Sequence, residues 1–463
     1  MAHALTERLA PTVVRNTLSR YGRHVRQALE DLRLRDVGLG GQTFVPVSGL
    51  PDDERLDAFF APSDVAFHAL GEYRGKRLTL LDLMRNPRTR TTKTYPSLVI
   101  VARAVQHIWQ TGERVMIVTP SSANKATALR DAVLWAIECD LVTPEQLQIL
   151  SVVPLSSRPK LWSSPLSEDG DLARRNPLVT YGGGEPGDVK LLARQLVEGQ
   201  TEQLWQRHGV RLWHTMDIEN YKAADVVRAH AEREFLPVEP GAARLHVHAV
   251  SSAFGLLGHN LGIEQLARDG QVDPASAHYF LVQHLGTPDM VLGLRFGDAS
   301  RDLLPAYQYD PVQGLYRQDA DPHFPQRTYA VDEILDPTFY TRRPATSAQM
   351  HQLIRQRGGG GIVVSLHECL ERYGELRALL GPAGTELPAD PRQLREWSLA
   401  IAVTGMLNAI DRGLVAEDDI LVHGSGSYDS TDYRPIPEGG LVPVDDVAAL
   451  AAVAEHAVTV GPR

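Results

Sequence analysis

Short apolar strands alternate with helices along most of this chain, and this alternation restricts the fold more than any other feature of the sequence. The first series of predicted strands, most of them followed by a helical stretch, lies at residues 115–118, 147–153, 176–181 and 210–213. The second series lies at residues 245–250, 280–283, 361–364 and 420–422. Strands that alternate with helices build parallel sheets covered by helices, so the sequence predicts an α/β fold.

Length, charge and apolar content limit the classes of protein. The chain has 463 residues, with 43% hydrophobic and 22% charged residues, which is ordinary for a globular protein with a buried core. Its formal net charge is -10, and its basic residues are scattered apart from those between Arg85 and Lys93. A nucleic-acid footprint normally needs a basic face, so we expect no nucleic-acid partner.

Cysteines and targeting segments give little sign of a secreted or membrane protein. The two cysteines, Cys139 and Cys369, form no Cys-x-x-Cys pair, which leaves a disulfide framework and a cysteine zinc site unsupported. The first twenty residues lack an apolar signal region, and no run of about eighteen apolar residues occurs. We therefore expect a cytoplasmic protein without a membrane partner.

Two serine turns follow predicted strands and open helices. They are Ser121-Ser122-Ala123-Asn124 and Ser251-Ser252-Ala253-Phe254-Gly255. Ligands of parallel sheets bind at the carboxyl ends of strands, and a helix N-terminus offers N–H groups to an anion. Serine also caps helices without any ligand, and this reading is favoured for either turn alone. Neither turn is a Walker loop or a dinucleotide fingerprint, which weakens ATP and NAD as cofactors.

Lys93 is a candidate nucleophile just before an apolar helix at residues 98–105. A lysine opposes the helix dipole at that position, which suits an amine bonded to something better than a solvated one. Arg88 and Arg90 are nearby cations that could lower its pKa. Taken alone, a solvated or phosphate-neutralising lysine remains the favoured interpretation.

The order of these motifs resembles fold-type II pyridoxal-phosphate enzymes of the tryptophan synthase β-chain type, and threonine synthases most of all. Asn86-Pro87 followed by Lys93 resembles their cofactor-lysine segment, and residues 119–128 are similar to their Ser-Ser-Gly-Asn loop and helix. Residues 248–262 stand where their phosphate loop is expected, and His423-Gly424-Ser425-Gly426 is similar to their closing Thr-Gly-His-Gly turn. The resemblance covers roughly residues 80–430.

The resemblance implies a two-domain α/β fold with pyridoxal 5'-phosphate between the domains. The expected pieces are an N-terminal helical extension at 1–75, a large cofactor domain from 76–105 plus 215–463, and a small α/β domain at 106–214. Lys93 would form the Schiff base and act as general base. The residues expected to bind the cofactor with it are Asn124, Ser251, Ser252, Ala253, Phe254, Gly255, His423 and Ser425.

Further roles follow from the same resemblance. Ser121, Ser122 and Ala123 would hold the carboxylate of a small amino-acid substrate. The pyridine nitrogen would face a neutral group, with Ser425 favoured over His423, and Asp429 is the nearest carboxylate. The reaction implied is β- or γ-elimination or replacement through an aminoacrylate-like intermediate, in amino-acid metabolism of a specialised kind. A homodimer is left open.

Departures from the family pattern keep two alternatives in view. Lys93 is followed by Thr94-Tyr95 instead of Asp-Arg, Ala123 replaces a glycine, and Phe254 stands inside the phosphate loop. A non-catalytic ligand-binding protein on the same fold is the first alternative. An α/β transferase that works without pyridoxal phosphate is the second.

Two histidines and one long connection are the remaining candidate functional features of the sequence. His246 and His248 lie on one predicted strand and point to the same face, where they could bind a metal. No third ligand is apparent in the sequence, so a structural role is favoured and no metal site is predicted. Residues 297–347 are weakly periodic, which indicates a lid or a surface loop near the active site.

Overall fold

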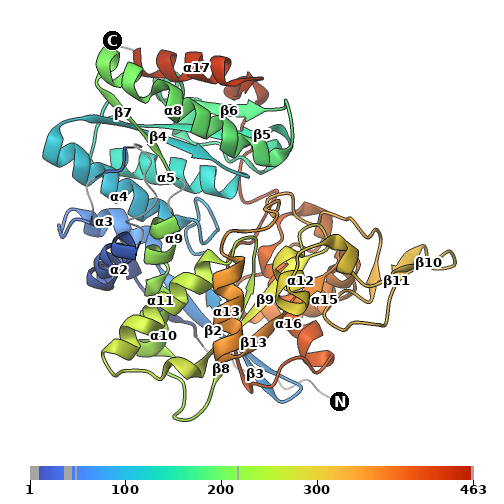
Figure 1. Cartoon of the computed structure of the whole chain (residues 1–463). Coiled ribbons are helices and arrows are strands. Elements are labelled where there is room, and N and C mark those ends of the chain that lie inside the picture. Colours follow the sequence, from blue (N-terminus) through green and yellow to red (C-terminus); the bar gives the residue numbers. More distant parts are fainter. Residues whose placement is uncertain (1–9, 36–43, 47–48, 216–217, 460–463) are drawn as a thin grey trace. The chain divides into compact units, whose positions relative to one another are not determined.

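The computed structural model describes residues 10–35, 44–46, 49–215 and 218–459, and each of its two compact units is built around one sheet (Figure 1). The first, here called the seven-stranded unit, contains residues 10–15, 64–85 and 229–430. The second, here called the five-stranded unit, contains the other described residues, which fall within 16–63, 86–228 and 431–459.

The seven-stranded sheet is parallel over most of its width. Its strands, in spatial order, are β1 (Thr12–Val14), β2 (Val65–Tyr73), β3 (Lys76–Asp82), β15 (Asp419–Gly424), β8 (Arg244–Ala249), β9 (Ala277–His284) and β13 (Gly359–Val364). The pairs β1–β2 and β2–β3 are antiparallel, and all pairs from β3 to β13 are parallel. β15 and β8 are buried along their whole length, as is typical of strands in a parallel sheet covered by helices.

Helices cover both faces of this sheet. One face packs against α14 (Leu366–Glu371), α15 (Tyr373–Leu380) and α16 (Ser398–Asp411). The other packs against α10 (Val226–Phe235), α11 (Phe254–Arg268), α12 (Asp289–Phe296) and α13 (Ser347–Arg357). Successive residues of a strand point to opposite faces, so Phe280 and Val282 join the first cluster while Tyr279 and Leu281 join the second.

The five-stranded sheet is entirely parallel. Its spatial order is β17 (Val442–Val444), β6 (Leu178–Tyr181), β5 (Leu147–Pro154), β4 (Arg114–Pro120) and β7 (Val210–His214). Figure 1 shows α8 (Val189–His208) and α17 (Val447–Thr459) on one side, with α4 (Thr94–Thr111) and α5 (Asn124–Glu138) on the other. The shorter helices α1 (Thr17–Arg20), α2 (Gly22–Arg35), α3 (Leu56–Phe60) and α9 (Ile218–Ala224) complete the unit.

The boundaries of these two units differ from the boundaries of the predicted domains. The N-terminal extension predicted to be helical supplies β1 and β2 to the seven-stranded sheet, while residues 1–9 lie outside the described part. Its three helices belong to the five-stranded unit, as does the C-terminal segment that adds β17 and α17. β1 and β17 are edge strands of three residues each, and β2 pairs antiparallel with both of its neighbours, so none of them belongs to the strand–helix alternation.

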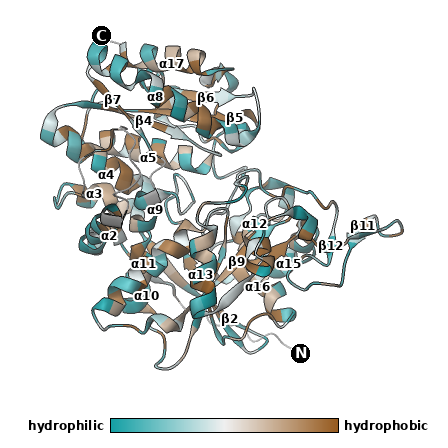
Figure 2. Ribbon diagram, viewed as in Figure 1, coloured by the Kyte–Doolittle hydropathy of each residue, from teal (hydrophilic) through white to brown (hydrophobic). Residues whose placement is uncertain are grey.

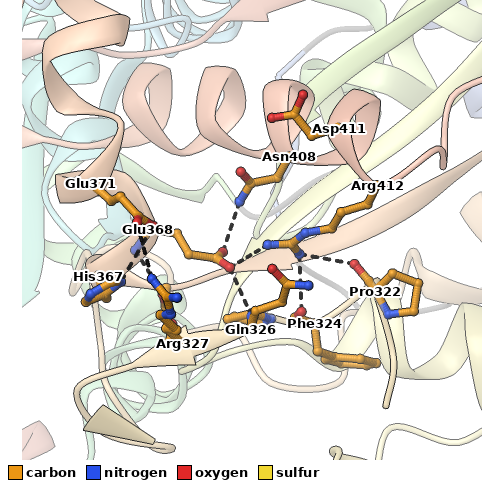
Figure 3. A network of polar contacts seen from close by, with 12 residues as sticks. Pro322, Phe324, Gln326, Arg327, His367, Glu368, Glu371, Asn408, Asp411 and Arg412 are labelled. Carbon is orange, nitrogen blue, oxygen red and sulfur yellow. Dashed lines mark hydrogen bonds and ion pairs between the residues drawn. The ribbon is translucent and has the colours of Figure 1, made fainter. Parts of the chain in front are cut away.

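The connection at residues 297–347 folds as a surface excursion of the seven-stranded unit. It contains the antiparallel strands β10 (Gln308–Asp310), β11 (Leu315–Arg317) and β12 (Arg327–Thr328). Figure 3 shows how one part of it is fastened: Glu368 accepts the backbone N–H of Gln326 over 3.0 Å, and Arg412 donates to the carbonyl oxygens of Pro322 and Phe324 over 3.1 and 3.2 Å. Burial raises the pKa of Glu368, although its partner Arg412 acts in the opposite direction. The buried end of the excursion is therefore a fixed part of the unit.

Hydropathy follows this layered arrangement. In Figure 2, hydrophobic residues lie toward the sheets, and hydrophilic residues lie on the outer turns of the helices. Within the described part of the chain, no helix has both the length and the apolar content needed to cross a bilayer.

Candidate active site

Lys93 lies directly before α4, at the end of a turn fixed by side-chain hydrogen bonds. The Asn86 amide donates to the carboxylate of Asp131 over 2.9 Å, and its oxygen accepts the backbone N–H of Arg88 over 3.0 Å. The Thr91 hydroxyl accepts the backbone N–H of Lys93 over 3.3 Å. The half-buried Lys93 side chain therefore starts from a well-defined backbone position in the five-stranded unit.

Tyr221 of α9 gives this lysine an aromatic neighbour. The Nζ atoms of Lys93 and Lys125 lie 5.9 and 5.5 Å from the centre of its ring. α9 is held beside α4 by the buried Arg103, whose guanidinium contacts the Glu219 carboxylate over 2.7 Å. The sequence analysis did not select Tyr221, because only packing of α9 on α4 brings the ring to the lysines.

One of the two amines near Tyr221, that of Lys125, is bonded to the backbone. The Lys125 Nζ donates to the backbone carbonyl of Thr215 over 2.8 Å, so this amine serves to connect α5 to the end of β7. Burial, together with the positive charges of Lys125 and Arg194, lowers the pKa of the neighbouring His214 to about 4. This end of the five-stranded sheet is thus a positively charged environment, which suits an anionic ligand.

The first serine turn connects β4 to α5. Ser121 is buried, and its Oγ accepts the backbone N–H groups of Ala123 over 3.1 Å and Ala126 over 2.9 Å. It therefore satisfies two N–H groups at the start of its own helix, which is the capping role expected of serine without a ligand. Its hydroxyl hydrogen is still a donor, so the predicted contact with a substrate carboxylate stays a prediction, as do those of Ser122 and Ala123. Asn124 is the first residue of α5.

Ala123 has an unusual backbone for a residue with a side chain. Its φ is 132° and its ψ is -65°, and the residue is fully buried. Residues other than glycine rarely adopt such angles, and those that do are concentrated at functional sites. The conformation explains why a glycine suits this position in the family that the chain resembles.

The second serine turn connects β8 to α11 in the seven-stranded unit. Ser251 and Ser252 are half-buried, and Ala253 takes the left-handed conformation with φ 51° before α11 begins at Phe254. The Thr346 hydroxyl donates to the Ser252 carbonyl over 2.6 Å and fixes the turn from outside. No hydrogen bond to the hydroxyls of Ser251 or Ser252 occurs among the residues that the structure describes. Both hydroxyls and the helix N-terminus, with Gly255 in its first turn, can therefore serve an anion.

The closing turn follows β15 in the same unit. His423 is fully buried, and its Nε2 lies 3.1 Å from Nδ1 of His246, inside a group of histidines. Ser425 lies after the end of the strand and is 8% exposed, while Asp429 belongs to the short strand β16 (Tyr428–Asp429). The preference for Ser425 over His423 at the pyridine nitrogen remains a prediction, and the position of the His423 ring agrees with it.

Two residues that the sequence analysis did not select lie beside His246. Glu232 of α10 and His259 of α11 approach it closely, and both are buried. A signal did exist, because each interrupts the apolar face of its helix: Glu232 follows Ala229 by three residues, and His259 lies between Leu256 and Ile263. Their convergence on one strand residue depends on how the helices cross the sheet, which sequence spacing does not give.

Comparison with known proteins places this fold. A profile of the Family of unknown function (DUF6002) matches residues 13–458. No curated protein matches the sequence. Among solved structures, threonine synthase from yeast matches with a TM-score of 0.50 at 9% identity, covering 86% of this chain and 81% of that chain.

Two further structures match less closely. Threonine synthase from Brucella melitensis with bound pyridoxal phosphate has a TM-score of 0.46 and 13% identity, covering 83% of this chain and 79% of that chain. A fungal L-serine ammonia-lyase from Rhizomucor miehei has a TM-score of 0.46 and 12% identity, covering 77% of this chain and 90% of that chain. The match to the yeast enzyme confirms the predicted two-domain fold of fold-type II pyridoxal-phosphate enzymes.

Proposed function

The chain belongs to the Family of unknown function (DUF6002), and we propose that it is a pyridoxal-phosphate enzyme that carries out elimination or replacement at the β or γ carbon of an amino acid. The observation that carries this proposal is the position of Lys93, a half-buried primary amine on a fixed turn before α4, in a chain with the fold of threonine synthase. A fold alone does not imply a function, so the proposal depends on what the residues can do.

The side chains present fit the chemical groups of pyridoxal phosphate. The turn from Ser251 to Gly255 offers two hydroxyls and a helix N-terminus to a phosphate dianion. Lys93 offers the amine for the aldehyde, and Asn124, at the start of α5, offers an amide for the ring oxygen. Ser425 offers a neutral hydroxyl for the ring nitrogen. When bound, the cofactor supplies an electron sink for the bond broken at the substrate Cα.

Lys93 would have two tasks in turn. Its amine would hold the aldehyde of the cofactor in the resting enzyme, and during the reaction it would accept the proton from the substrate Cα. The Tyr221 ring beneath the amine is suited to hold it in position, because an ammonium is attracted to the face of an aromatic ring. A neutral partner such as Ser425 leaves the pyridine nitrogen without a proton, which favours loss of a β- or γ-substituent over transamination.

Borohydride reduction of the purified chain with pyridoxal phosphate tests this assignment. We expect the reduced cofactor on the peptide that contains Lys93. Lys93→Arg keeps the charge but cannot form the imine, so we expect it to lose the label and to lower turnover by at least about 100-fold. Lys125→Arg is the matched control, because Lys125 faces the same ring and already bonds to Thr215.

The outcomes separate the alternatives. Label on Lys125 would contradict the role of Lys93. Cofactor fixed at Lys93, without consumption of any amino acid in a screen of β- and γ-substituted substrates, would favour a non-catalytic binding protein. A chain that takes up no pyridoxal phosphate would favour a transferase of another kind.

A further inference from the structure

A buried group of metal-binding side chains lies behind the central strands of the seven-stranded unit. Glu232 from α10, His246 from β8 and His259 from α11 place one ligand atom each within 4.8 Å of one another. The three residues are 4%, 1% and 0% exposed. Among the described residues, no other group of three or more such side chains has a spacing that could hold a metal ion.

The position of this group within an apolar layer needs an explanation. β8 alternates between the two helix layers, and Leu245, Val247 and Ala249 pack toward α16. His246 is in register with Tyr279 and therefore faces α10 and α11. The charge of Glu232 is compensated by the buried Arg244, whose Nη1 lies 2.8 Å from Glu232 Oε1, because desolvation of an unpartnered carboxylate would cost several kcal/mol. The sequence thus keeps three polar ligands where apolar residues would fill the same space.

Outer contacts orient both histidines toward the centre of the group. Nδ1 of His259 lies 3.1 Å from the Tyr279 hydroxyl, which leaves Nε2 directed at Glu232. Nδ1 of His246 lies 3.1 Å from Nε2 of His423, and its own Nε2 is the nitrogen near Glu232. Metal-binding histidines characteristically bond through their second nitrogen in this way, which fixes the ring and the tautomer.

The distances are close to those of a zinc site. Glu232 Oε2 and His259 Nε2 are 2.7 Å apart, and Glu232 Oε1 and His246 Nε2 are 3.8 Å apart. With bonds of about 2.0–2.2 Å, ligands of tetrahedral zinc stand roughly 3.4 Å from one another. The shorter pair would therefore open by less than about 1 Å, which rotation of the Glu232 side chain can supply.

An open position remains next to the group. Glu232 and His246 line a cavity of about 630 Å³ whose other walls come from residues 229–277 of the same unit. Three protein ligands with access to a cavity are typical of a zinc site that keeps water as its fourth ligand, whereas structural zinc sites are closed by four side chains. Two imidazoles and one carboxylate suit zinc and its transition-metal neighbours better than Mg²⁺ or Ca²⁺.

We propose that Glu232, His246 and His259 form a binding site for a divalent transition ion of the zinc type, with water in the fourth position. The Tyr279 hydroxyl and His423 are positioning residues that act through the two histidines. All of these groups belong to the seven-stranded unit. None of the three ligands is among the residues expected to bind the cofactor, so either proposal can fail without the other.

Titration of the full-length chain with zinc, after removal of metals by a chelator, tests this proposal. We expect one equivalent to bind in competition with a chromophoric chelator, and cobalt(II) in its place to give the visible bands of a tetrahedral complex. His259→Gln and Glu232→Gln should each weaken zinc binding by at least about 100-fold, since they remove a direct ligand, and Tyr279→Phe by about 10–100-fold. His351→Gln is the control, because His351 is a buried histidine of the same unit that bonds to the Met290 carbonyl instead.

The measurements on the unmodified chain keep the proposal testable if a ligand variant does not fold. Failure to bind one equivalent of zinc at micromolar concentration would overturn it, as would a cobalt spectrum of the octahedral, solvated ion. Zinc bound equally well by His259→Gln or by Tyr279→Phe and the unmodified chain would also overturn it. The group would then be a metal-free polar network.

Discussion

The two serine turns begin with the same tripeptide, Ser-Ser-Ala, at the same point of a strand–turn–helix connection, yet their hydroxyls do different things. In the five-stranded unit, Ser121 accepts two N–H groups at the start of its own helix. In the seven-stranded unit, the turn is fixed from outside by Thr346, and the hydroxyls of Ser251 and Ser252 remain available within the described structure. The comparison teaches that one tripeptide can cap a helix in one unit and be available to a ligand in the other.

The largest effect should come from the turn with available hydroxyls. Ser252→Ala is expected to weaken pyridoxal-phosphate binding by about 10–150-fold, which corresponds to roughly 1.5–3 kcal/mol for one lost hydrogen bond to a charged group. Thermal unfolding of the cofactor-free chain should change little, since the hydroxyl has no partner to lose. A titration followed by cofactor absorbance measures the affinity.

Ser122→Ala is the control for that titration, because its hydroxyl is not assigned to the phosphate. An unchanged cofactor affinity after Ser251 and Ser252 are both replaced by alanine would show that the phosphate binds elsewhere. The two turns would then not differ in the way described above.

A smaller effect, on stability, is expected at the capping turn. Ser121→Ala leaves the buried N–H groups of Ala123 and Ala126 without their acceptor, so the free energy of unfolding should fall by about 1–2 kcal/mol. Ser252→Ala, at the other turn, should stay within about 0.5 kcal/mol of the unmodified chain. Urea unfolding of the cofactor-free proteins measures both, and equal losses would contradict the assigned roles.

The smallest effect concerns the alanines that end each tripeptide. Ala123 has φ 132° and ψ -65°, whereas Ala253 has φ 51° and ψ 18°, a conformation that side chains tolerate better. Ala123→Gly should relieve about 1–3 kcal/mol of strain against a loss of about 0.5–1 kcal/mol in chain entropy. We therefore expect a net gain in unfolding free energy of about 1 kcal/mol.

Ala253→Gly provides the comparison for that measurement. Its strain is close to the entropic cost of glycine, so the change in unfolding free energy should be near zero. The same urea unfolding experiment measures both variants. A larger gain at Ala253 than at Ala123 would show that backbone strain is not concentrated at the turn beside Lys93.

Periodicity predicted most of the architecture because it reflects burial, which acts on every residue of an element. All eight predicted strands are present, and β4 and β8 start within one residue of the predicted positions. The two serine turns are also at the predicted ends of strands. β1, β2, β3 and β17 were not predicted as strands, because β1 and β17 have three residues each, and β2 and β3 form an antiparallel pair outside the strand–helix alternation.

The residues of the candidate site were also only partly predictable from the sequence. Lys93 and the serine turns could be selected from the sequence because each lies at a helix start next to a recognisable motif. Tyr221 could not, since it reaches Lys93 only when the buried contact between Arg103 and Glu219 holds α9 against α4.

By itself, the sequence determined the α/β layering, the turns at the carboxyl ends of strands and the amine that we assign to the cofactor, because these follow from local periodicity and local backbone chemistry. The tertiary structure alone decided which hydroxyls are already bonded, how strained Ala123 is, and that Glu232 and His259 meet at His246. Those properties depend on the angles and distances at which helices cross a sheet, and side chains far apart in the chain come within 4.8 Å only when packing fixes those crossings.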